Sequence, residues 1–519
     1  MIPKRTDYER LSSALYSGNL MTIGYTLGID IGTFESKGVI ADDHGRIIAQ
    51  AACPHKMIVP RAGWAEHRAE QDWWGDFVQL ARTLLAAAKI EPKSIRAVAT
   101  SAIGPCMLPV DPDGTPLMNG VLYGVDTRAT AEIAWLNTQI GEDIILARCG
   151  NALTSQSVGP KILWLRRNHP EIWARTAKIL TSTSYLVHRL TGQIVIDHHT
   201  AASFSPLYDC NSQDWSADLA GICEADQLPR LMWSTDIAGH ITAAAAQETG
   251  LAIGTPVTCG TIDAAAEAVS IGVQAIGDMM MMYGSTIFII QITDRRLADT
   301  RLWQTPWLYP GQFSAMAGLA TSGTLTHWMR DQFARDLPPD TAFATLTAEA
   351  DASPPGAKGL ICLPYFSGER TPIHNPQAKG AFFGLNLTHS RGDMYRAAIE
   401  GIAAATRHIT DTYAEAGATP NRVLAVGGGT KNRPWLQATS DMTGLDQSLC
   451  KVATGASFGN AFLASLATGR SSADDIARWN PVSETIKATA HPAYLRQYPL
   501  FRRLYDATKD IAADLSVAD

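Results

Sequence analysis

Short runs of alternating hydrophobic and polar residues are separated by longer helical patterns along most of the chain. The first run, residues 25–30, predicts a β-strand whose odd-numbered side chains share one face and whose even-numbered side chains share the other. Gly32 and Thr33 suit a tight turn, and residues 37–41 predict the returning strand. A strand–turn–strand hairpin is therefore expected around residue 32.

The same arrangement returns about half the chain later. Residues 279–283 predict an apolar strand, Gly284, Ser285 and Thr286 predict a turn, and residues 287–290 predict another strand. A hairpin that opens each half of the chain indicates two lobes of related topology.

Strand-like and helical patterns alternate throughout, which predicts an α/β architecture. We expect an N-terminal lobe over residues 24–270 and a C-terminal lobe over residues 271–519. No long Pro/Ser-rich linker separates them, so the lobes should pack closely. Residues 1–23 are expected to form a loose extension, with Met21 as an alternative start of translation.

Two patterns in the second half predict further elements. Apolar residues recur at spacings of three and four between Met394 and Tyr413, as in an amphipathic helix with one core-facing stripe. Residues 423–426 predict a strand, residues 427–429 a glycine turn, and Pro434 the beginning of a helix.

Composition narrows the class of protein. The 519 residues are 46% hydrophobic and 18% charged, as in a soluble globular protein. The net charge of −7, without a long basic run, argues against nucleic acid or an anionic membrane as the main partner. The eight cysteines form no CxxC pair or zinc-like cluster, which predicts reduced thiols in a cytoplasmic protein. The N-terminus has no apolar core typical of a secretory signal.

The first turn carries groups suited to a phosphate. Small residues let backbone N–H groups approach phosphate oxygens, and Thr33 and Lys37 add a hydroxyl and a positive charge. Asp30, at the end of the strand, can bind Mg²⁺ directly or through water. The alternative is a plain hairpin with a capping aspartate.

The second turn, residues 284–286, has the same equipment, so the pair suggests a phosphate chain clamped between the lobes. The chain contains no Walker A motif, which disfavours a P-loop fold. Residues 427–429 do not fit GxGxxG, which disfavours a Rossmann dinucleotide site. Three glycines would instead let the backbone pass close to a flat ligand such as adenine.

Asp263 is the candidate catalytic residue. It follows the apolar strand of residues 256–259 and precedes an alanine-rich helix, where the helix dipole favours a carboxylate. One interpretation is a helix N-cap. The other is a general base, because phosphoryl transfer to an alcohol needs a carboxylate that takes the hydroxyl proton.

These motifs together resemble the FGGY family of carbohydrate kinases. DIGTFESKG, the Cys259–Asp263 element, MYGST, LPYFSGERTPIHNPQAKGAFFGL and VLAVGGGTKNRPWLQ stand in the family's order, and GWAEH at residues 63–67 is similar to its N-terminal element. The resemblance covers roughly residues 24–470. It implies a two-lobed, actin-like ATPase (ribonuclease H-like) fold with mixed sheets and flanking helices, and phosphorylation of a sugar hydroxyl with ATP and Mg²⁺.

The resemblance also implies roles for individual residues. Asp263 would be the catalytic base and Asp30 would help hold Mg²⁺. The ATP and phosphate contacts would be Thr33, Lys37, Gly284, Ser285, Thr286, Gly318, Thr324, Gly428, Gly429 and Asn432. The sugar contacts would be Trp64, Gly104, Pro105 and Asp126, together with Asp263.

Within the family the sequence is most similar to xylulokinases, so a pentulose such as xylulose is the first expectation. Two departures leave the sugar open. Residues 103–105 replace the Gln-Met-His of those enzymes, and Tyr123 stands one position away from their usual tryptophan, although Asp126 and Arg128 remain. Another ketose, a deoxy sugar or a polyol is the alternative. A sugar sensor without catalysis and an actin-like ATPase are more distant alternatives, and a homodimer is one candidate oligomeric state.

Two other groups of polar residues could be read as functional sites, but structural roles explain them as well. His198 and His199 look like a metal pair but lack a third ligand at useful spacing. Glu369 and Arg370 stand beside an apolar run, where an ion pair between the lobes or anchoring a loop is as good an explanation as catalysis.

Overall fold

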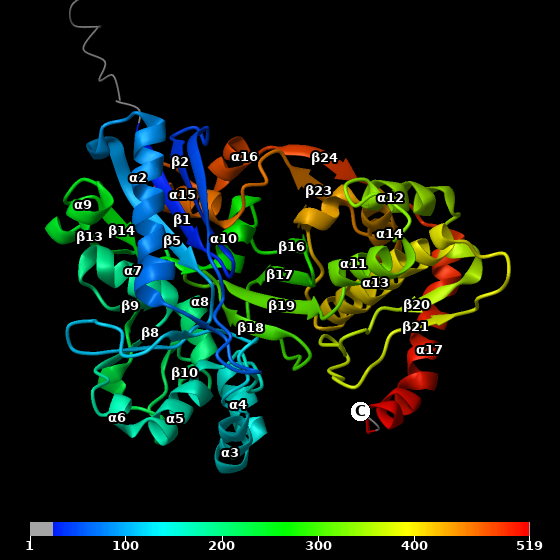
Figure 1. Cartoon of the computed structure of the whole chain (residues 1–519), viewed down its shortest axis with the longest axis horizontal. Helices are drawn as coiled ribbons and strands as arrows, with labels where there is room; N and C mark the ends of the chain where they lie inside the picture. Colours follow the sequence, from blue (N-terminus) through cyan, green and yellow to red (C-terminus); the bar gives the residue numbers. More distant parts are fainter. Residues whose placement is uncertain (1–23, 518–519) are drawn as a thin grey trace, which may run out of the picture.

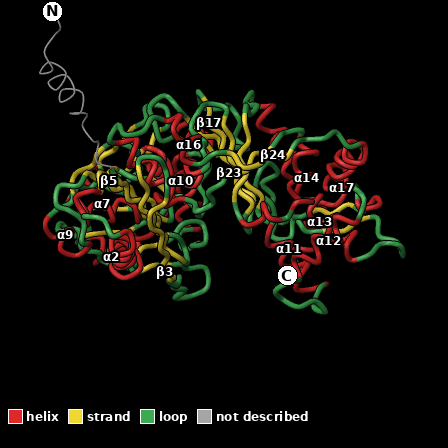
Figure 2. The backbone as a smooth tube through the Cα atoms, turned by 90° about the horizontal axis from the view of Figure 1, so that it is seen from above, coloured by secondary structure: helices red, strands yellow, loops and turns green. Residues whose placement is uncertain are grey.

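The computed structural model describes residues 24–517, so the extension expected over residues 1–23 and the alternative start at Met21 lie outside the described residues. Two bodies lie side by side, each built around its own β-sheet (Figure 1). Seen from above, they are separate bodies joined in the middle of the molecule (Figure 2). Within the described residues, no helix has the length and apolar character needed to cross a membrane.

The first sheet has seven strands. They are β1 (Tyr25–Ile31), β2 (Glu35–Asp42), β3 (Ile47–Pro54), β5 (Ile95–Ala102), β13 (Ile237–His240), β14 (Pro256–Thr258) and β15 (Thr261–Ile262). The order is β13-β14-β5-β1-β2-β3, and β15 pairs with β5 off this path. β1 is antiparallel to β2 and parallel to β5, so the expected first hairpin is confirmed.

The second sheet also has seven strands. They are β16 (Asp278–Tyr283), β17 (Ile287–Thr293), β18 (Trp303–Pro306), β19 (Phe313–Leu319), β22 (Arg422–Val426), β23 (Gln447–Cys450) and β24 (Val482–Ile486). The order is β18-β19-β17-β16-β22-β23-β24. In both sheets an antiparallel hairpin is followed by a parallel neighbour, which confirms the prediction of two lobes of related topology.

Helices cover both sheets. The helices that precede the second sheet in the chain are α2 (Asp76–Ala88), α3 (Thr130–Ile140), α4 (Glu142–Cys149), α5 (Val158–Asn168), α6 (Pro170–Trp173), α7 (Ser182–Thr191), α8 (His198–Ala201), α9 (Ala243–Thr249) and α10 (Asp263–Ser270). The later ones are α11 (Gly323–Phe333), α12 (Ala342–Ala352), α13 (Arg391–Glu415), α14 (Arg433–Thr443), α15 (Ala456–Ala467), α16 (Ile476–Trp479) and α17 (Pro492–Val517). The amphipathic pattern around residues 394–413 lies within α13, as predicted.

Shorter strands complete the fold. They are β4 (Glu66–His67), β6 (Leu108–Val110), β7 (Gly120–Val121), β8 (Lys178–Leu180), β9 (Val195–Asp197), β10 (Tyr208–Asp209), β11 (Asp214–Trp215), β12 (Arg230–Met232), β20 (Ile361–Leu363) and β21 (Ala381–Phe383). The predicted strand, glycine turn and helix over residues 423–434 are found as β22, a short 3₁₀ turn and α14.

The two sheets share one inner core. Helices α10 and α15 pack against each other, and α10 lies between the two sheets in Figure 1. Their apolar side chains join Val39 of the first sheet and Met280 of the second in one buried cluster. The outer faces have separate cores, against α2 in the first body and against α13 and α14 in the second.

Glycines permit the close approach of α15. A Cβ on Gly28 of β1 would lie 2.0 Å from the carbonyl oxygen of Ser457, and one on Gly459 would lie 1.9 Å from that of Ala266. Both distances are far below van der Waals contact, so only glycine fits at either position. Helix α15 therefore packs directly against β1 and α10. These two elements carry Asp30 and Asp263.

Candidate active site

Asp263 is the first residue of α10, and Ile262 occupies the N-cap position, so the N-cap interpretation is wrong. Its Oδ1 accepts a hydrogen bond of 2.8 Å from the N–H of Ala264. Burial raises the pKa of Asp263 to about 6, with a further rise from the charge of Glu267 and an opposing effect of the Ala264 bond. A carboxylate with this pKa is ionised at neutral pH and is a stronger proton acceptor than an ordinary aspartate.

Asp30 lies at the end of β1 in a buried hydrogen-bonded chain. The Ser101 hydroxyl donates to Asp30 Oδ1 at 2.6 Å, and Asn460 Nδ2 donates to Ser101 Oγ at 2.7 Å. Because the amide of Asn460 can only donate here, the Ser101 proton is directed to Asp30. The same Asn460 amide group donates to the carbonyl of Ile29 at 2.9 Å, so α15 fixes the end of β1.

Negative charge accumulates around Asp30. Burial and the charge of Asp263 raise the pKa of Asp30 to about 7, although Ser101 and Lys37 act in the other direction. Burial and the charge of Asp30 raise the pKa of Glu267 to about 7 as well. These shifts show that three carboxyl groups share a region in which their negative charges are poorly compensated.

This arrangement fits a divalent cation held by few protein ligands. Within residues 24–517, no cluster of three or more His, Cys, Asp or Glu side chains is arranged to hold a metal ion. Mg²⁺ commonly binds through one or two carboxylates plus the phosphates of a nucleotide, rather than in a cage made only of protein. The excess negative charge around Asp30 is what such a cation would relieve.

The first turn joins β1 to β2 beside these carboxylates. Lys37 forms an ion pair with Glu35 at 3.0 Å, and its positive charge also lowers the pKa values of Asp30 and Glu267. Burial raises the pKa of Tyr123, and the neighbouring hydroxyl of Thr33 partly offsets that rise. The turn therefore lies near both Tyr123 and the carboxylates.

The second turn borders a large cavity of about 820 Å³. Among the predicted nucleotide contacts, those that line this cavity are Gly284, Ser285, Gly428, Gly429 and Asn432. Asn432 caps α14, since its Oδ1 accepts from the N–H of Trp435 at 3.2 Å. Sequence reasoning missed the opposite wall, which includes Phe343 and Thr347 of α12 and carries no recognisable motif.

The other predicted nucleotide contacts lie behind or beside this cavity. The N–H and Oγ1 of Thr324 both donate to the carbonyl of Ser285 at 3.1 Å, so Thr324 holds the second turn. The carbonyl of Gly318 accepts from the N–H of Thr371 at 3.3 Å. Thr286, Gly318 and Thr324 are not among the residues that line the cavity.

The predicted sugar contacts lie in the first body. Trp64 is half-buried between two guanidinium groups, with those of Arg61 and Arg128 at 3.6 and 3.9 Å from its ring centroid. Gly104 lies against β15, directly before Asp263, because a Cβ there would be 2.3 Å from Cγ2 of Ile262. Pro105, which follows it, is buried.

Asp126, the fourth predicted sugar contact of the first body, lies in a buried ion pair with Arg128. Its side chain is fully buried, and its two oxygens accept from Arg128 and from the N–H of Ala65. The sugar contact of Asp126 stays a prediction, and in this structure Asp126 supports the Arg128 guanidinium that stacks on Trp64. Burial was decided by packing that the sequence pattern does not reveal.

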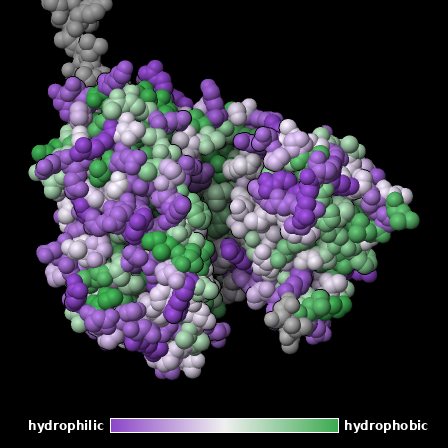
Figure 3. Space-filling model, in the orientation of Figure 1, coloured by the Kyte–Doolittle hydropathy of each residue, from purple (hydrophilic) through white to green (hydrophobic). Residues whose placement is uncertain are grey.

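The second body reaches the same cleft through Arg370. The charges of Asp263 and Arg370 both shift the pKa of Tyr123, which places residues of the two bodies around one site. Figure 3 shows a hollow between the two bodies on this face of the molecule. Tyr123 and Arg370 are not among the predicted ATP or sugar contacts, although catalysis was one of the interpretations open for Arg370.

The remaining polar candidates have structural roles. Glu369 Oε1 accepts from the N–H groups of Ala320 and Arg370 at 2.8 and 2.7 Å, so Glu369 anchors a loop through backbone bonds rather than an ion pair. His198 Nδ1 lies 2.8 Å from the Tyr208 hydroxyl, and His199 Nδ1 lies 3.0 Å from the carbonyl of Pro306. The two histidines thus bond separate parts of the protein.

Two bodies of related topology, a large cavity at the glycine turns and the Asp263 carboxylate between the bodies are features of a two-lobed phosphotransferase. Comparison with known proteins agrees. Residues 25–270 match the FGGY family of carbohydrate kinases, N-terminal domain, and residues 279–468 match its C-terminal domain. The chain belongs to the FGGY family of carbohydrate kinases, and the expected actin-like fold and kinase class are confirmed.

Individual relatives cover nearly the whole chain. The xylulose kinase of Bacillus subtilis (strain 168) is 27% identical over 94% of this chain and 98% of that relative. The gluconokinase of the same organism is 26% identical over 90% of this chain and 91% of that relative. The crystal structure of xylulose kinase from Rhodospirillum rubrum is 30% identical, with a TM-score of 0.88 over 94% of this chain and 100% of that one.

Proposed function

We propose that the protein transfers the γ-phosphoryl group of ATP to a hydroxyl of a sugar, with Asp263 as the general base. The observation that carries this proposal is the position of Asp263 at the start of α10, between the two sheets and beside Asp30. Its pKa of about 6 suits a base that is ionised at neutral pH.

The nucleotide is assigned to the second body. The cavity of about 820 Å³ is of the size of small-molecule sites and is bordered by two backbone turns, at Gly284 and Gly428. We assign the adenosine to the part of it near Gly428, Gly429 and Asn432. The triphosphate then extends along Gly284 and Ser285 toward Thr33 and Lys37 of the first body.

In the proposed reaction the sugar hydroxyl loses its proton to a carboxylate oxygen of Asp263. The hydroxyl oxygen forms a bond to the γ-phosphorus, and the bond from that phosphorus to the β–γ bridging oxygen breaks, leaving ADP. Asp30 would hold Mg²⁺ with the phosphates, and the cation would supply positive charge to the transferred group. Closure of the bodies excludes water, which limits hydrolysis of ATP.

The sugar is assigned to the first body, near Trp64 and residues 104–105. A pentulose such as xylulose is the first candidate, because the relatives include enzymes named xylulose kinase. Another ketose, a deoxy sugar or a polyol is the alternative, since Gly104 and Pro105 offer no side-chain donor where xylulokinases carry a histidine. A gluconokinase is almost equally similar in sequence. The carboxylates of Asp30 and Asp263 beside the first turn favour a kinase over a sugar sensor or an actin-like ATPase.

The first experiment measures ADP release with a panel of ketoses, deoxyketoses, polyols and gluconate. ATP turnover without sugar serves as the background. Strong stimulation by one class of sugar is expected, and the preferred compound identifies the acceptor. ATP turnover that no sugar stimulates would favour the actin-like ATPase, and sugar binding without phosphorylation would favour the sensor.

Asp263→Asn tests the base. The asparagine oxygen can still accept the bond from Ala264, so the start of α10 should survive. We expect turnover to fall by about 10²–10⁴-fold with ATP binding nearly unchanged. Asp393→Asn is the control, because Asp393 is another carboxylate in the first turn of a helix, buried in the outer part of the second body. It should lower stability and leave turnover intact, whereas wild-type turnover in Asp263→Asn would refute the assignment.

A further inference from the structure

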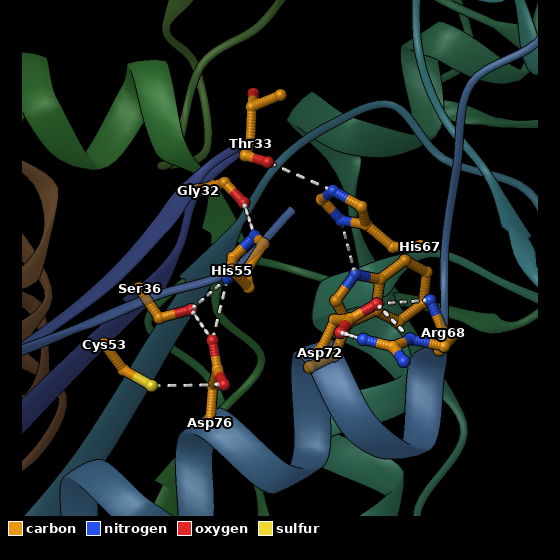
Figure 4. Close-up of polar contacts among 10 residues, drawn as sticks. Gly32, Thr33, Ser36, Cys53, His55, His67, Arg68, Asp72 and Asp76 are labelled. Atoms are coloured by element: carbon orange, nitrogen blue, oxygen red, sulfur yellow. Dashed lines mark hydrogen bonds and ion pairs between the residues drawn. The ribbon is translucent and has the colours of Figure 1, made fainter. Parts of the chain in front are cut away.

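His55 and His67 contact the backbone of the first turn, residues 32–34 (Figure 4). His55 Nε2 lies 3.0 Å from the carbonyl oxygen of Gly32, and His67 Nε2 lies 3.1 Å from that of Thr33. The backbone N–H of His55 also donates to the carbonyl of Phe34 at 3.0 Å. All three carbonyl groups of the turn are therefore engaged on the side of the histidines.

The partners of His67 determine which of its nitrogens carries the proton. The indole N–H of the fully buried Trp73 donates to His67 Nδ1 at 3.1 Å. An indole N–H can only donate, so Nδ1 is an acceptor, and Nε2 carries the hydrogen that is donated to Thr33. Burial lowers the pKa of His67 to about 4, with a further lowering from His55, which keeps the ring neutral at physiological pH.

His55 is held differently. Its Nδ1 lies 2.8 Å from Oδ2 of Asp76, the first residue of α2, while Nε2 faces the Gly32 carbonyl. Since both partners are acceptors, both nitrogens of His55 donate and the ring is an imidazolium. Burial lowers the pKa of His55, but the Asp76 carboxylate overrides this effect and the pKa lies above its ordinary value.

Other groups around the rings support this assignment. Asp76 also accepts from the Ser36 hydroxyl at 2.7 Å and from the Cys53 thiol at 3.4 Å. The only other charged residues drawn beside the rings in Figure 4, Asp72 and Arg68, form an ion pair at 2.6 Å. The two imidazole rings meet edge to face with centroids 4.9 Å apart.

Because peptide bonds are planar, these contacts to the carbonyl groups also fix the direction of the N–H groups of the turn. In a trans peptide the C=O and the following N–H point in opposite directions, and the peptides after Gly32 and Thr33 are trans. When both carbonyls are fixed on the histidines, the N–H groups of Thr33 and Phe34 point away from them. Among residues 24–517, no acceptor is hydrogen-bonded to either N–H group.

We propose that His55 and His67 are positioning residues that aim the N–H groups of Thr33 and Phe34 at the terminal phosphates of the nucleotide. The inference rests on the proposed function, which brings a triphosphate to this turn. Neither histidine touches the substrate. Each acts through one peptide unit, and without it that unit can rotate its N–H away from the phosphate oxygens.

Substitutions of His67 separate positioning from folding. His67→Leu removes the donor to Thr33, whereas His67→Gln keeps an oxygen that can accept from Trp73 and an N–H that can donate to Thr33. His408→Leu is the matched control, because it removes another buried histidine, from α13 in the second body. Binding of ATP–Mg²⁺ and of AMP is measured by calorimetry, and the KM values for ATP and for the sugar are measured by steady-state kinetics.

We expect His67→Leu to weaken ATP binding and raise the KM for ATP by on the order of tenfold, the effect of about one charge-assisted hydrogen bond. AMP binding and the KM for the sugar should change by less than about twofold, since neither ligand reaches the turn amides. His67→Gln should restore most of the loss, and His408→Leu should show none. Equal losses for ATP and AMP, or unchanged ATP binding in His67→Leu, would overturn the inference.

Hydrogen–deuterium exchange on the wild-type protein gives an independent test that needs no variant to fold. The ATP analogue AMPPNP with Mg²⁺ should slow exchange in peptides spanning residues 31–37, and AMP should not. Absence of this difference, in a protein that binds AMPPNP, overturns the inference and leaves the kinase proposal intact. A wild-type protein that binds neither nucleotide would instead refute the proposed function.

Discussion

Ser101 offers a sharp test of the buried hydrogen-bonded chain. Ser101→Ala removes the 2.6 Å bond to Asp30 and deprives one N–H of Asn460 of its acceptor. A bond to an ionised group contributes about 1.5–3 kcal/mol to the free energy of unfolding. Ser182→Ala is the matched control, because that equally buried hydroxyl donates at 2.5 Å to the neutral carbonyl of Ile103. A neutral bond contributes about 0.5–1.5 kcal/mol, so we expect a difference of about 1–2 kcal/mol at pH 8.5.

The pH dependence of this difference follows from Asp30. Its pKa rises from 3.8 to about 7 on folding, so the folded state binds more protons over that interval and stability falls as the pH rises through it. Without the Ser101 donor the pKa should rise further, and each pKa unit corresponds to about 1.4 kcal/mol. The additional cost of Ser101→Ala therefore appears above pH 7, and at pH 5.5 only the cost of a neutral bond should remain.

Urea unfolding with EDTA, followed by tryptophan fluorescence at pH 5.5 and 8.5, measures both quantities. Titration of Asp263 and Glu267 affects the wild type and the variant alike, so the comparison between them isolates the bond to Asp30. Equal costs for Ser101→Ala at the two pH values would show that the hydroxyl does not stabilise an ionised Asp30. A cost for Ser182→Ala as large as that for Ser101→Ala at pH 8.5 would refute the reasoning as well.

Two further predictions concern the packing and the histidines. Gly459→Ala should lower the unfolding free energy by about 1–3 kcal/mol, because its Cβ would lie 1.9 Å from the carbonyl oxygen of Ala266. Gly75→Ala is the control, since its Cβ would have its nearest neighbour at 3.4 Å. An unchanged thermal midpoint of Gly459→Ala would contradict this prediction. Burial and the charges of Arg502 and Arg301 lower the pKa of His408 from 6.5 to about 4. As the pH falls through this interval, the unfolded chain binds a proton at His408 before the folded protein does, so stability is lost between pH 6.5 and pH 4. Denaturation between pH 7 and 4.5 should show that His408→Gln loses about 2–3 kcal/mol less than the wild type, and parallel curves would refute this.

Local patterns predicted much of the fold and part of the site. Both hairpins, the start of α10 and the glycine turn before α14 were recognisable, because alternation and turn chemistry act over a few neighbouring residues. The five predicted nucleotide contacts that line the cavity lie in or directly after such turns, so local motifs could bring them to one cavity.

Contacts across the chain depended on the tertiary structure. Asn460 bonds Ser101 across 359 positions, and His67 bonds Thr33 across 34, although neither pair shares a motif. The burial of Asp126 and the wall of the cavity from α12 also required the packing of distant elements.

The sequence by itself determined which side chains and turns were available for phosphate, cation and proton. Only the tertiary structure decided that α15 packs against β1 and α10, that Asp30 and Asp263 share one poorly compensated region, and that two histidines orient the first turn. The physical reason is that propensity is local, whereas desolvation and hydrogen bonding depend on which groups are neighbours in space.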